Sequence, residues 1–109
     1  MTGRFMYVVR VKIPLKDEKE WNRWHDKIHI PKVLAQPGFI QARKFRAVTN
    51  AAKKEAEYFV LYELQNQTAY VKYAQSEEGA KLRQEYLDMY GSKTKITRWA
   101  WQETFHIVK

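Results

Sequence analysis

Two histidines and two tryptophans are crowded into the short segment WNRWHDKIHIP, residues 21–31. Imidazole changes charge near neutral pH, so His25 and His29 are candidates for a general base or acid. At about 100° of rotation per residue, a helix would place Trp21, Trp24, His25 and Ile28 on one stripe, with His29 at its margin. The indole rings would then shape a pocket and exclude water around a proton-carrying histidine.

A base of this kind needs polar groups that stabilise the charge it creates. Strand positions supply candidates, and we expect Tyr62 and Arg43 to be catalytic beside the histidines. The predicted substrate contacts are Trp21, Trp24, Tyr7, Gln41 and Phe39. Which strand residues face the helix depends on register, because a slip of one residue exchanges the two faces of a strand.

Other interpretations of the histidine pair stay open at this stage. The tryptophans and His25 could belong to the core, with His25 satisfied by a hydrogen bond. Two histidines at positions i and i+4 can also bind a metal, but a third ligand is missing, Glu63 and His106 being the conceivable ones, and we expect no metal. Haem held by one axial histidine is an alternative to the cofactor-free site that we expect.

Two regions of the sequence have the signals of helices. Asp17 and Glu20 have the spacing of a capping box for a helix that runs to about Ile28, and Pro31 should stop or bend it, leaving about one further turn. The second region is capped by Asn66 or Thr68, restarts near Ser76 and continues to Tyr90. Its apolar stripe is predicted to be Leu82, Tyr86 and Met89, with Gly91 as the stop.

Four segments are typical of strands: residues 4–13, 39–48, 57–65 and 95–108, with a polar turn over residues 49–54. The order βαββαβ indicates a single α+β domain over residues 1–109, a ferredoxin-like four-stranded antiparallel sheet with both helices on one face. Bulky apolar side chains occur on both faces of the third and fourth strands, so we expect a second copy of the chain to cover the other face.

The amino-acid composition limits the kinds of partner and reactive group that the protein can have. The chain has 109 residues, 45% of them apolar, no cysteine and a net charge of +8. The absence of cysteine excludes disulfides and a thiol nucleophile. The basic residues are scattered among acidic ones, so we expect no nucleic acid, although the RNA-recognition motif shares the element order. Apolar runs too short for a membrane span predict a soluble, cytoplasmic protein.

The chain resembles the dimeric alpha+beta barrel superfamily, in its EthD-like and antibiotic-biosynthesis-monooxygenase-like branch. The resemblance rests on WNRWHDKIHIP, on Gln36-Pro-Gly-Phe39 before a basic strand, on Tyr58-Phe-Val-Leu-Tyr-Glu-Leu64 and on the element order. It implies a homodimer with a cavity between each sheet and its helices. The superfamily includes monooxygenases, polyketide cyclases, isomerases, haem-degrading enzymes and peroxidases, so the resemblance alone selects no reaction.

From these observations we expect a small homodimeric enzyme that acts on a hydrophobic aromatic or polyketide-like, possibly anionic, molecule. The predicted chemistry is cofactor-free proton transfer of the lyase, cyclase or isomerase type. The alternatives are a cofactor-free or haem-linked monooxygenase and a non-catalytic, ligand-binding, stress-responsive dimer.

Overall fold

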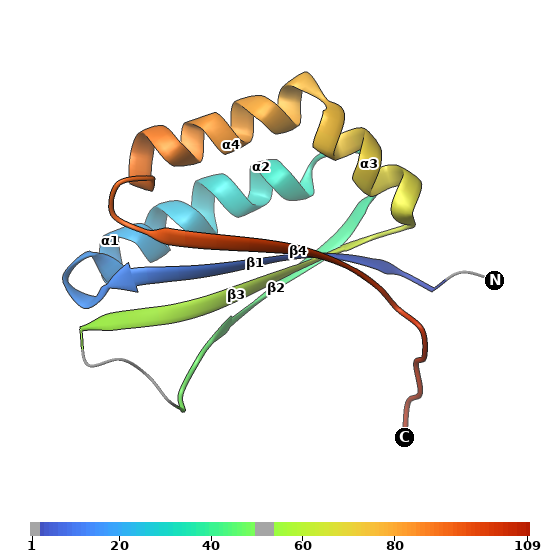
Figure 1. Ribbon diagram of the computed structural model, residues 1–109, viewed down its shortest axis with the longest axis horizontal. Coiled ribbons are helices and arrows are strands. Elements are labelled where there is room, and N and C mark those ends of the chain that lie inside the picture. The colour runs from blue at the N-terminus through green and yellow to red at the C-terminus, as the bar shows by residue number, and fades with distance from the viewer. Residues whose placement is uncertain (1–2, 50–53) are drawn as a thin grey trace.

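The computed structural model describes residues 3–49 and 54–109. The elements follow the expected βαββαβ order, with each helical region divided into shorter segments (Figure 1). They are β1 (Phe5–Pro14), α1 (Leu15–Trp24), the π-helical η1 (His25–His29), α2 (Ile30–Leu34), β2 (Phe39–Arg46), β3 (Glu55–Leu64), α3 (Gln67–Gln75), α4 (Glu77–Tyr90) and β4 (Lys95–Gln102). Most of the polar turn predicted over residues 49–54 lies outside the described residues. No helix within them is both long and apolar enough to cross a membrane.

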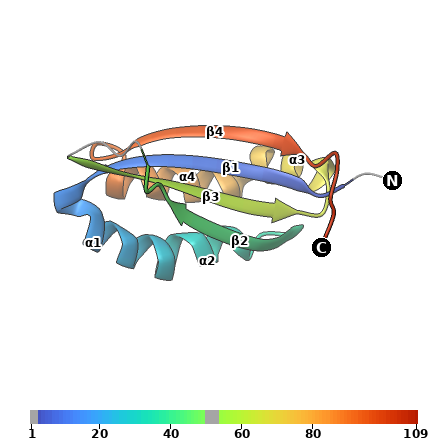
Figure 2. The same ribbon diagram turned by 90° about the horizontal axis from the view of Figure 1, so that it is seen from below.

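The strands form one antiparallel sheet in the order β2-β3-β1-β4. All helices lie on the same face of this sheet, and the view from below shows the strands with no element covering them (Figure 2). The predicted ferredoxin-like α+β architecture is therefore confirmed. Residue pairs such as Tyr7 opposite Tyr62 set the register of the two central strands.

The core lies between the sheet and the helices. Alternate residues of β1 and β3 point into it, as the two-residue period of a strand requires. One cluster contains Tyr7, Val60 and Tyr62 with Tyr73 of α3. The other joins Trp21 of α1 to residues of both central strands and of α4, namely Val11, Ile13, Ala56, Tyr58, Tyr86 and Tyr90. The candidate site lies where these two clusters meet.

The first helical region begins earlier and ends later than its pattern indicates. Pro14 precedes its first residue, with no side-chain cap, so the capping box predicted at Asp17 does not form. The helix does not stop near Ile28 but continues to Leu34 through the wider turn of η1, in which the N–H of Ile30 bonds to the carbonyl of His25. Pro31 gives the reason: it lacks an N–H, and in an unbroken α-helix its ring would collide with the carbonyl four residues earlier.

The second helical region is divided as expected. Asn66 caps α3, and Ser76 caps α4 by accepting a hydrogen bond from the N–H of Gly79. The buried stripe of α4 is Leu82, Tyr86 and Tyr90, whereas the side chain of Met89 is 49% exposed. The prediction of Met89 as a core residue was wrong because the stripe continues at an interval of four residues rather than three.

The last strand is shorter than its alternation suggests. β4 ends at Gln102, and residues 103–109 leave the sheet on the side away from the helices (Figure 1). The apolar side chains of this segment are highly exposed, with Phe105 and Ile107 each 77% accessible. They have the alternation of a strand, but they pair with no strand in the described part of the chain.

Gly38 makes the turn into β2, and its replacement provides a first prediction. Its φ of 87° lies in the region that only glycine adopts without strain, and an added Cβ would lie 2.4 Å from the Cβ of Ala69. We expect Gly38→Ala to lower the free energy of unfolding by roughly 2–3 kcal/mol, as measured by urea denaturation. Adding Ala69→Gly should recover only the part due to the clash, and an unchanged midpoint in the single variant would contradict this assignment.

Candidate functional site

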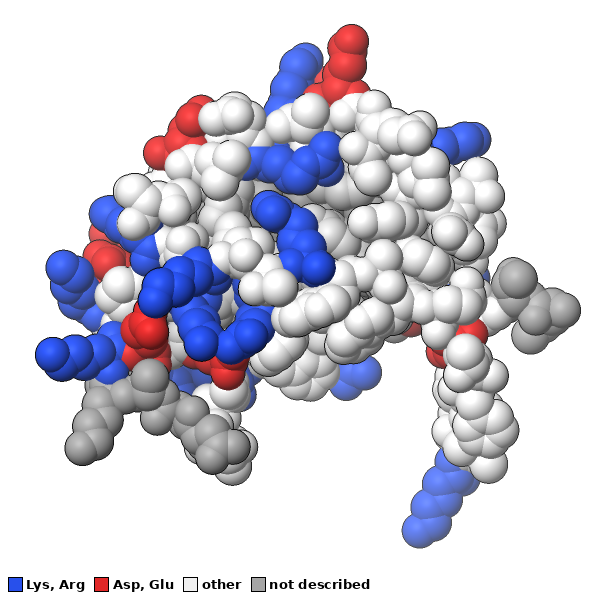
Figure 3. Space-filling model, in the orientation of Figure 1, with Lys and Arg blue, Asp and Glu red and all other residues white. Residues whose placement is uncertain are grey.

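A cavity with two chambers separates the helices from β1 and β4. The inner chamber has a volume of about 20 Å³ and reaches His25 and His29. The outer chamber, of about 240 Å³, lies nearer the surface. Four residues line both chambers, which therefore adjoin: Tyr7, Tyr73, Arg83 and Arg98. Figure 3 shows Lys and Arg side chains on both sides of the depression between α4 and β4.

The π-helical turn brings the two imidazoles together. Their ring centroids are 5.6 Å apart and the rings are nearly parallel. His25 is 2% exposed and stacks on Trp21 at 4.3 Å, while His29 stacks on Trp24 at 5.2 Å. A regular α-helix would favour Ile28 over His29 on this face, but the extra residue in the turn directs Ile28 to solvent at 42% exposure.

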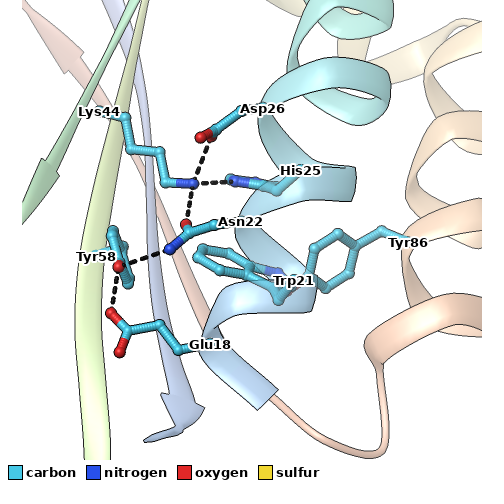
Figure 4. Close-up of polar contacts among 8 residues, drawn as sticks. All are labelled: Glu18, Trp21, Asn22, His25, Asp26, Lys44, Tyr58 and Tyr86. Carbon is cyan, nitrogen blue, oxygen red and sulfur yellow. Dashed lines mark hydrogen bonds and ion pairs between the residues drawn. The ribbon is translucent and has the colours of Figure 1, made fainter. Parts of the chain in front are cut away.

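Lys44 of β2 determines which ring nitrogen of His25 carries the proton (Figure 4). Its Nζ lies 3.0 Å from Nδ1 of His25 and donates to Asn22 Oδ1 at 2.7 Å and to Asp26 Oδ1 at 2.6 Å. An ammonium group has three protons and accepts no hydrogen bond, so Nδ1 of His25 must be the acceptor. The remaining proton of the neutral ring is therefore on Nε2.

The same network ties α1 to the sheet on the side away from the cavity. Asn22 donates through Nδ2 to the hydroxyl of Tyr58 at 2.9 Å, and that hydroxyl donates to the carboxylate of Glu18. Glu18 also pairs with Arg46 of β2 at 2.7 Å. These contacts hold the helix at a defined height above β2 and β3, and with it the position of His25.

Burial keeps both imidazoles neutral. Burial, together with the smaller effects of the nearby Lys44 and His29, lowers the pKa of His25 to about 2. It also lowers the pKa of His29 to about 4, although Glu85 opposes that shift. Nδ1 of His29 is buried and has no hydrogen-bond partner among the described residues. Nothing in the described chain therefore fixes which nitrogen of His29 carries the proton, in contrast to His25.

Tyrosines form most of the remaining polar lining. Burial raises the pKa of Tyr7, of Tyr62 and of Tyr73, the last to about 12, so all three stay protonated at neutral pH. Tyr86 is held by hydrogen bonds that its hydroxyl makes with Trp21 Nε1 at 3.2 Å and with Thr94 Oγ1 at 2.9 Å. The cavity thus contains neutral donors and acceptors with two arginines at the junction of its chambers.

A family model described as "Domain of unknown function (DUF4286)" matches residues 4–104. The chain belongs to this family. No protein with a curated description is significantly similar to it in sequence.

Solved structures with the same fold are distant in sequence. An EthD-family protein of Bacillus halodurans has a TM-score of 0.69 at 14% identity, over 92% of this chain and 99% of that chain. A dimeric ferredoxin-like protein of an uncultured marine organism has a TM-score of 0.72 at 11% identity, over 95% and 98%. The cofactor-independent oxygenase SnoaB of Streptomyces nogalater has a TM-score of 0.66 at 12% identity, over 97% and 98%. These similarities show that the chain shares the ferredoxin-like α+β fold of those proteins.

Four of the predicted site residues line the cavity of the DUF4286 domain, and three others pack behind them. Tyr7 and Tyr62 line it with the two histidines, and Phe39 packs edge-on against Tyr62 at 5.8 Å. Trp21 and Trp24 lie behind the histidines and contact their rings rather than the empty space.

The prediction that Gln41 and Arg43 reach this cavity was wrong. A bulge between Phe39 and Gln41 shifts the register of β2, so that Phe39 lies on the helix face and the later odd-numbered residues lie on the open face. Gln41 there donates to Glu63 at 3.1 Å, and the guanidinium of Arg43 lies 5.3 Å from the ring centroid of Phe45.

Sequence reasoning missed Lys44, Arg83, Arg98 and Tyr86. Lys44 takes the place expected for Arg43, one residue along the same strand. Arg98 alternates with Ile96 on the helix face of β4, so a correct assignment of that face would have found it. Arg83 directly follows the buried Leu82 and carries no comparable signal.

Neither of the cofactor alternatives finds a fitting site in the DUF4286 domain. Within residues 3–49 and 54–109, no three His, Cys, Asp or Glu side chains lie close enough to hold a metal ion. Haem does not fit either, because the chamber beside the histidines has room for about one water molecule and Nδ1 of His25 is occupied by Lys44.

Proposed function

We propose that the protein is a homodimeric, cofactor-free enzyme that moves a proton on a hydrophobic aromatic substrate. His29 accepts a proton from a carbon next to a carbonyl, and the electron pair of the broken C–H bond moves onto the carbonyl oxygen. His25 donates a hydrogen bond from Nε2 to that oxygen, where negative charge develops. Return of the proton to another atom of the substrate completes an isomerisation or starts a cyclisation.

The observation that carries this proposal is that two adjacent, neutral imidazoles have different hydrogen-bond partners. Lys44 limits His25 to hydrogen-bond donation, whereas Nδ1 of His29 has no partner within residues 3–49 and 54–109. Two carriers with different environments allow one to act as donor and the other as base in the same chamber. A purely structural core would not require a buried nitrogen to remain unsatisfied.

Cofactor-free oxygenation is a second candidate. SnoaB, which has the same fold, is described as a cofactor-independent oxygenase. Its chemistry supports the prediction that this chain also needs no cofactor. Deprotonation of the substrate would be the first step in that case too, with molecular oxygen as the oxidant that reacts with the resulting anion.

The dimer would form through the open face of the sheet. That face carries Leu61, Phe59, Trp99 and Trp101, and the ring of Trp99 lies 6.2 Å from each of the other two rings. Val8 beneath them is fully buried although all of the described helices lie on the other face of the sheet (Figure 2). A second copy is the partner that would remove so large an apolar surface from water, and one relative with this fold is described as dimeric.

Trp101→Glu tests this interface. A carboxylate buried between two sheets should raise the dissociation constant of the dimer at least about 100-fold, as measured by analytical ultracentrifugation. Leu87→Glu is the matched control, since Leu87 of α4 is 52% exposed and Trp101 is 48% exposed. A wild-type protein that sediments as one chain at all concentrations would contradict the proposed dimer.

Deuterium incorporation tests the proposed chemistry. Phenylpyruvate and benzoylacetate both combine an aromatic ring with an acidic C–H beside a carbonyl. In deuterated water the protein should accelerate exchange of that proton at least about 100-fold over matched buffer, as followed by proton NMR, with no cofactor added. Saturable binding of these compounds without exchange would favour the non-catalytic ligand-binding alternative.

A further inference from the structure

Two arginines from different elements face the same cavity. Arg83 of α4 and Arg98 of β4 line both of its chambers, at their junction. Each is held in place by uncharged groups. Arg98 Nε donates to the hydroxyl of Tyr7 at 3.1 Å, and Arg83 Nη2 donates to the carbonyl of Ala74 at 3.1 Å. The guanidinium of Arg83 also lies 5.3 Å from the ring centroid of Tyr73.

Neither guanidinium is paired with an acid in the described part of the chain. Its ion pairs include Lys44 with Asp26 and Arg46 with Glu18, but none contains Arg83 or Arg98. The tyrosines around them cannot supply a counter-charge, since burial raises the pKa of Tyr7 and of Tyr73 and keeps both protonated. Both guanidiniums line the same cavity, so an anion bound at the junction of its chambers would be attracted to two positive charges at once.

The shape of the outer chamber indicates the rest of the ligand. Its remaining walls are Ala74 and three tyrosine rings, in which Tyr7 packs against Tyr70 at a centroid distance of 5.7 Å and against Tyr73 at 5.9 Å. Flat aromatic walls favour a flat apolar body, which can stack on them or meet them edge-on. The small inner chamber beyond the arginines accepts only a group about as large as a carbonyl oxygen.

We propose that Arg83 and Arg98 anchor the carboxylate of an aromatic carboxylic acid, whose ring lies in the outer chamber and whose adjoining reactive group enters the inner chamber. The planar fork of a guanidinium matches a carboxylate with two parallel hydrogen bonds. A guanidinium also pairs with phosphate, so an aryl phosphate is the competing ligand that a binding test must distinguish. This assignment deepens the proposed function by naming the substrate class, but its test requires no turnover.

The test is calorimetric titration at low salt with three probes that share one ring system: naphthoate, naphthamide and naphthyl phosphate. Naphthoate should bind at least about tenfold more tightly than the neutral amide. Arg83→Gln and Arg98→Gln should each weaken naphthoate binding by at least about tenfold and leave amide binding unchanged. Arg23→Gln is the matched control, since Arg23 is an exposed arginine of α1 outside both chambers. Thermal melting of each variant confirms that it is folded, and Arg83→Lys and Arg98→Lys should retain part of the affinity.

Several results would overturn the anchor: no binding of naphthoate, equal binding of naphthoate and naphthamide, unchanged naphthoate affinity in both glutamine variants, or tighter binding of naphthyl phosphate than of naphthoate. The same titrations with the His25→Gln/His29→Gln double variant separate the anchor from the chemistry. Selective naphthoate binding that persists there, with no proton exchange by the wild-type protein, would retain the anchor and reject the proposed function. Proton exchange without selectivity for the carboxylate would do the reverse.

Discussion

Replacing His29 by Gln is expected to lower the catalysed exchange rate by about 10²–10⁴-fold, which is the usual contribution of a positioned general base. Gln retains most of the size of the histidine side chain but cannot act as a base at neutral pH. The protein should stay folded, because Nδ1 of His29 makes no hydrogen bond within the described chain that the substitution would remove. Exchange of the phenylpyruvate proton in deuterated water provides the rate.

His25→Gln should have a smaller effect of about 10–10³-fold, since it removes a hydrogen-bond donor rather than the base. The pH dependence distinguishes the two roles. In the wild type, kcat/KM should fall as the pH drops through about 4, the pKa of His29, and His25→Gln should leave this limb in place. His106→Gln is the control, since that histidine lies in the exposed C-terminal segment. Unchanged rates in both cavity variants would reject a catalytic role for the pair, and a larger loss in His25→Gln would exchange their roles.

Stability should decline on mild acidification, and by a large amount for so small a protein. In the unfolded chain a histidine takes up a proton near pH 6.5, whereas in the folded chain His29 does so near pH 4 and His25 near pH 2. The unfolded state therefore binds more protons below pH 6.5, and folding stability falls as the pH is lowered. Between pH 7 and pH 5 each histidine should cost up to about 2 kcal/mol, or about 4 kcal/mol together.

Urea unfolding followed by tryptophan fluorescence at pH 7, 6 and 5 measures this loss. His25→Gln and His29→Gln should each remove part of the slope, and His106→Gln should leave it unchanged. Glu18, whose pKa is lowered mainly by its hydrogen bond to Arg46, contributes only a small part of the loss at the acidic end of this interval. A free energy of unfolding that is constant from pH 7 to pH 5 would show that the imidazoles are accessible to water in the folded protein.

The architecture could be predicted from the sequence because its signals are local and repeated. The alternation in β1 and β3, the cap residues Asn66 and Ser76, and the order of the elements each indicate the same fold. Apolar side chains on both faces of the sheet also indicated an open surface that needs cover. Because many weak signals agreed, the fold could be predicted, even though the ends of several elements were misplaced by several residues.

The site was harder to predict from the sequence than the fold, because it depends on two departures from regular periodicity. The π-helical turn at His25–His29 and the bulge after Phe39 each insert one residue, and each changes which side chains face the cavity. A pattern that assumes uniform periods assigns Ile28 and Arg43 to the interior, where the protein has His29 and Lys44. Arg98 and Arg83 lie far from the histidines in sequence, so only the tertiary structure reveals that they share the same space.

The wide turn at His25–His29 also has a consequence for the ancestry of the site. Loss of a single residue there would restore ordinary α-helical hydrogen bonding and rotate the preceding residues by about 100° relative to those that follow. The sheet and the other helices would persist, but one imidazole would be carried out to the surface. Relatives that keep both histidines yet differ in the length of this segment should therefore have diverged in chemistry. The length of the segment should distinguish relatives of different activity better than the identity of its residues.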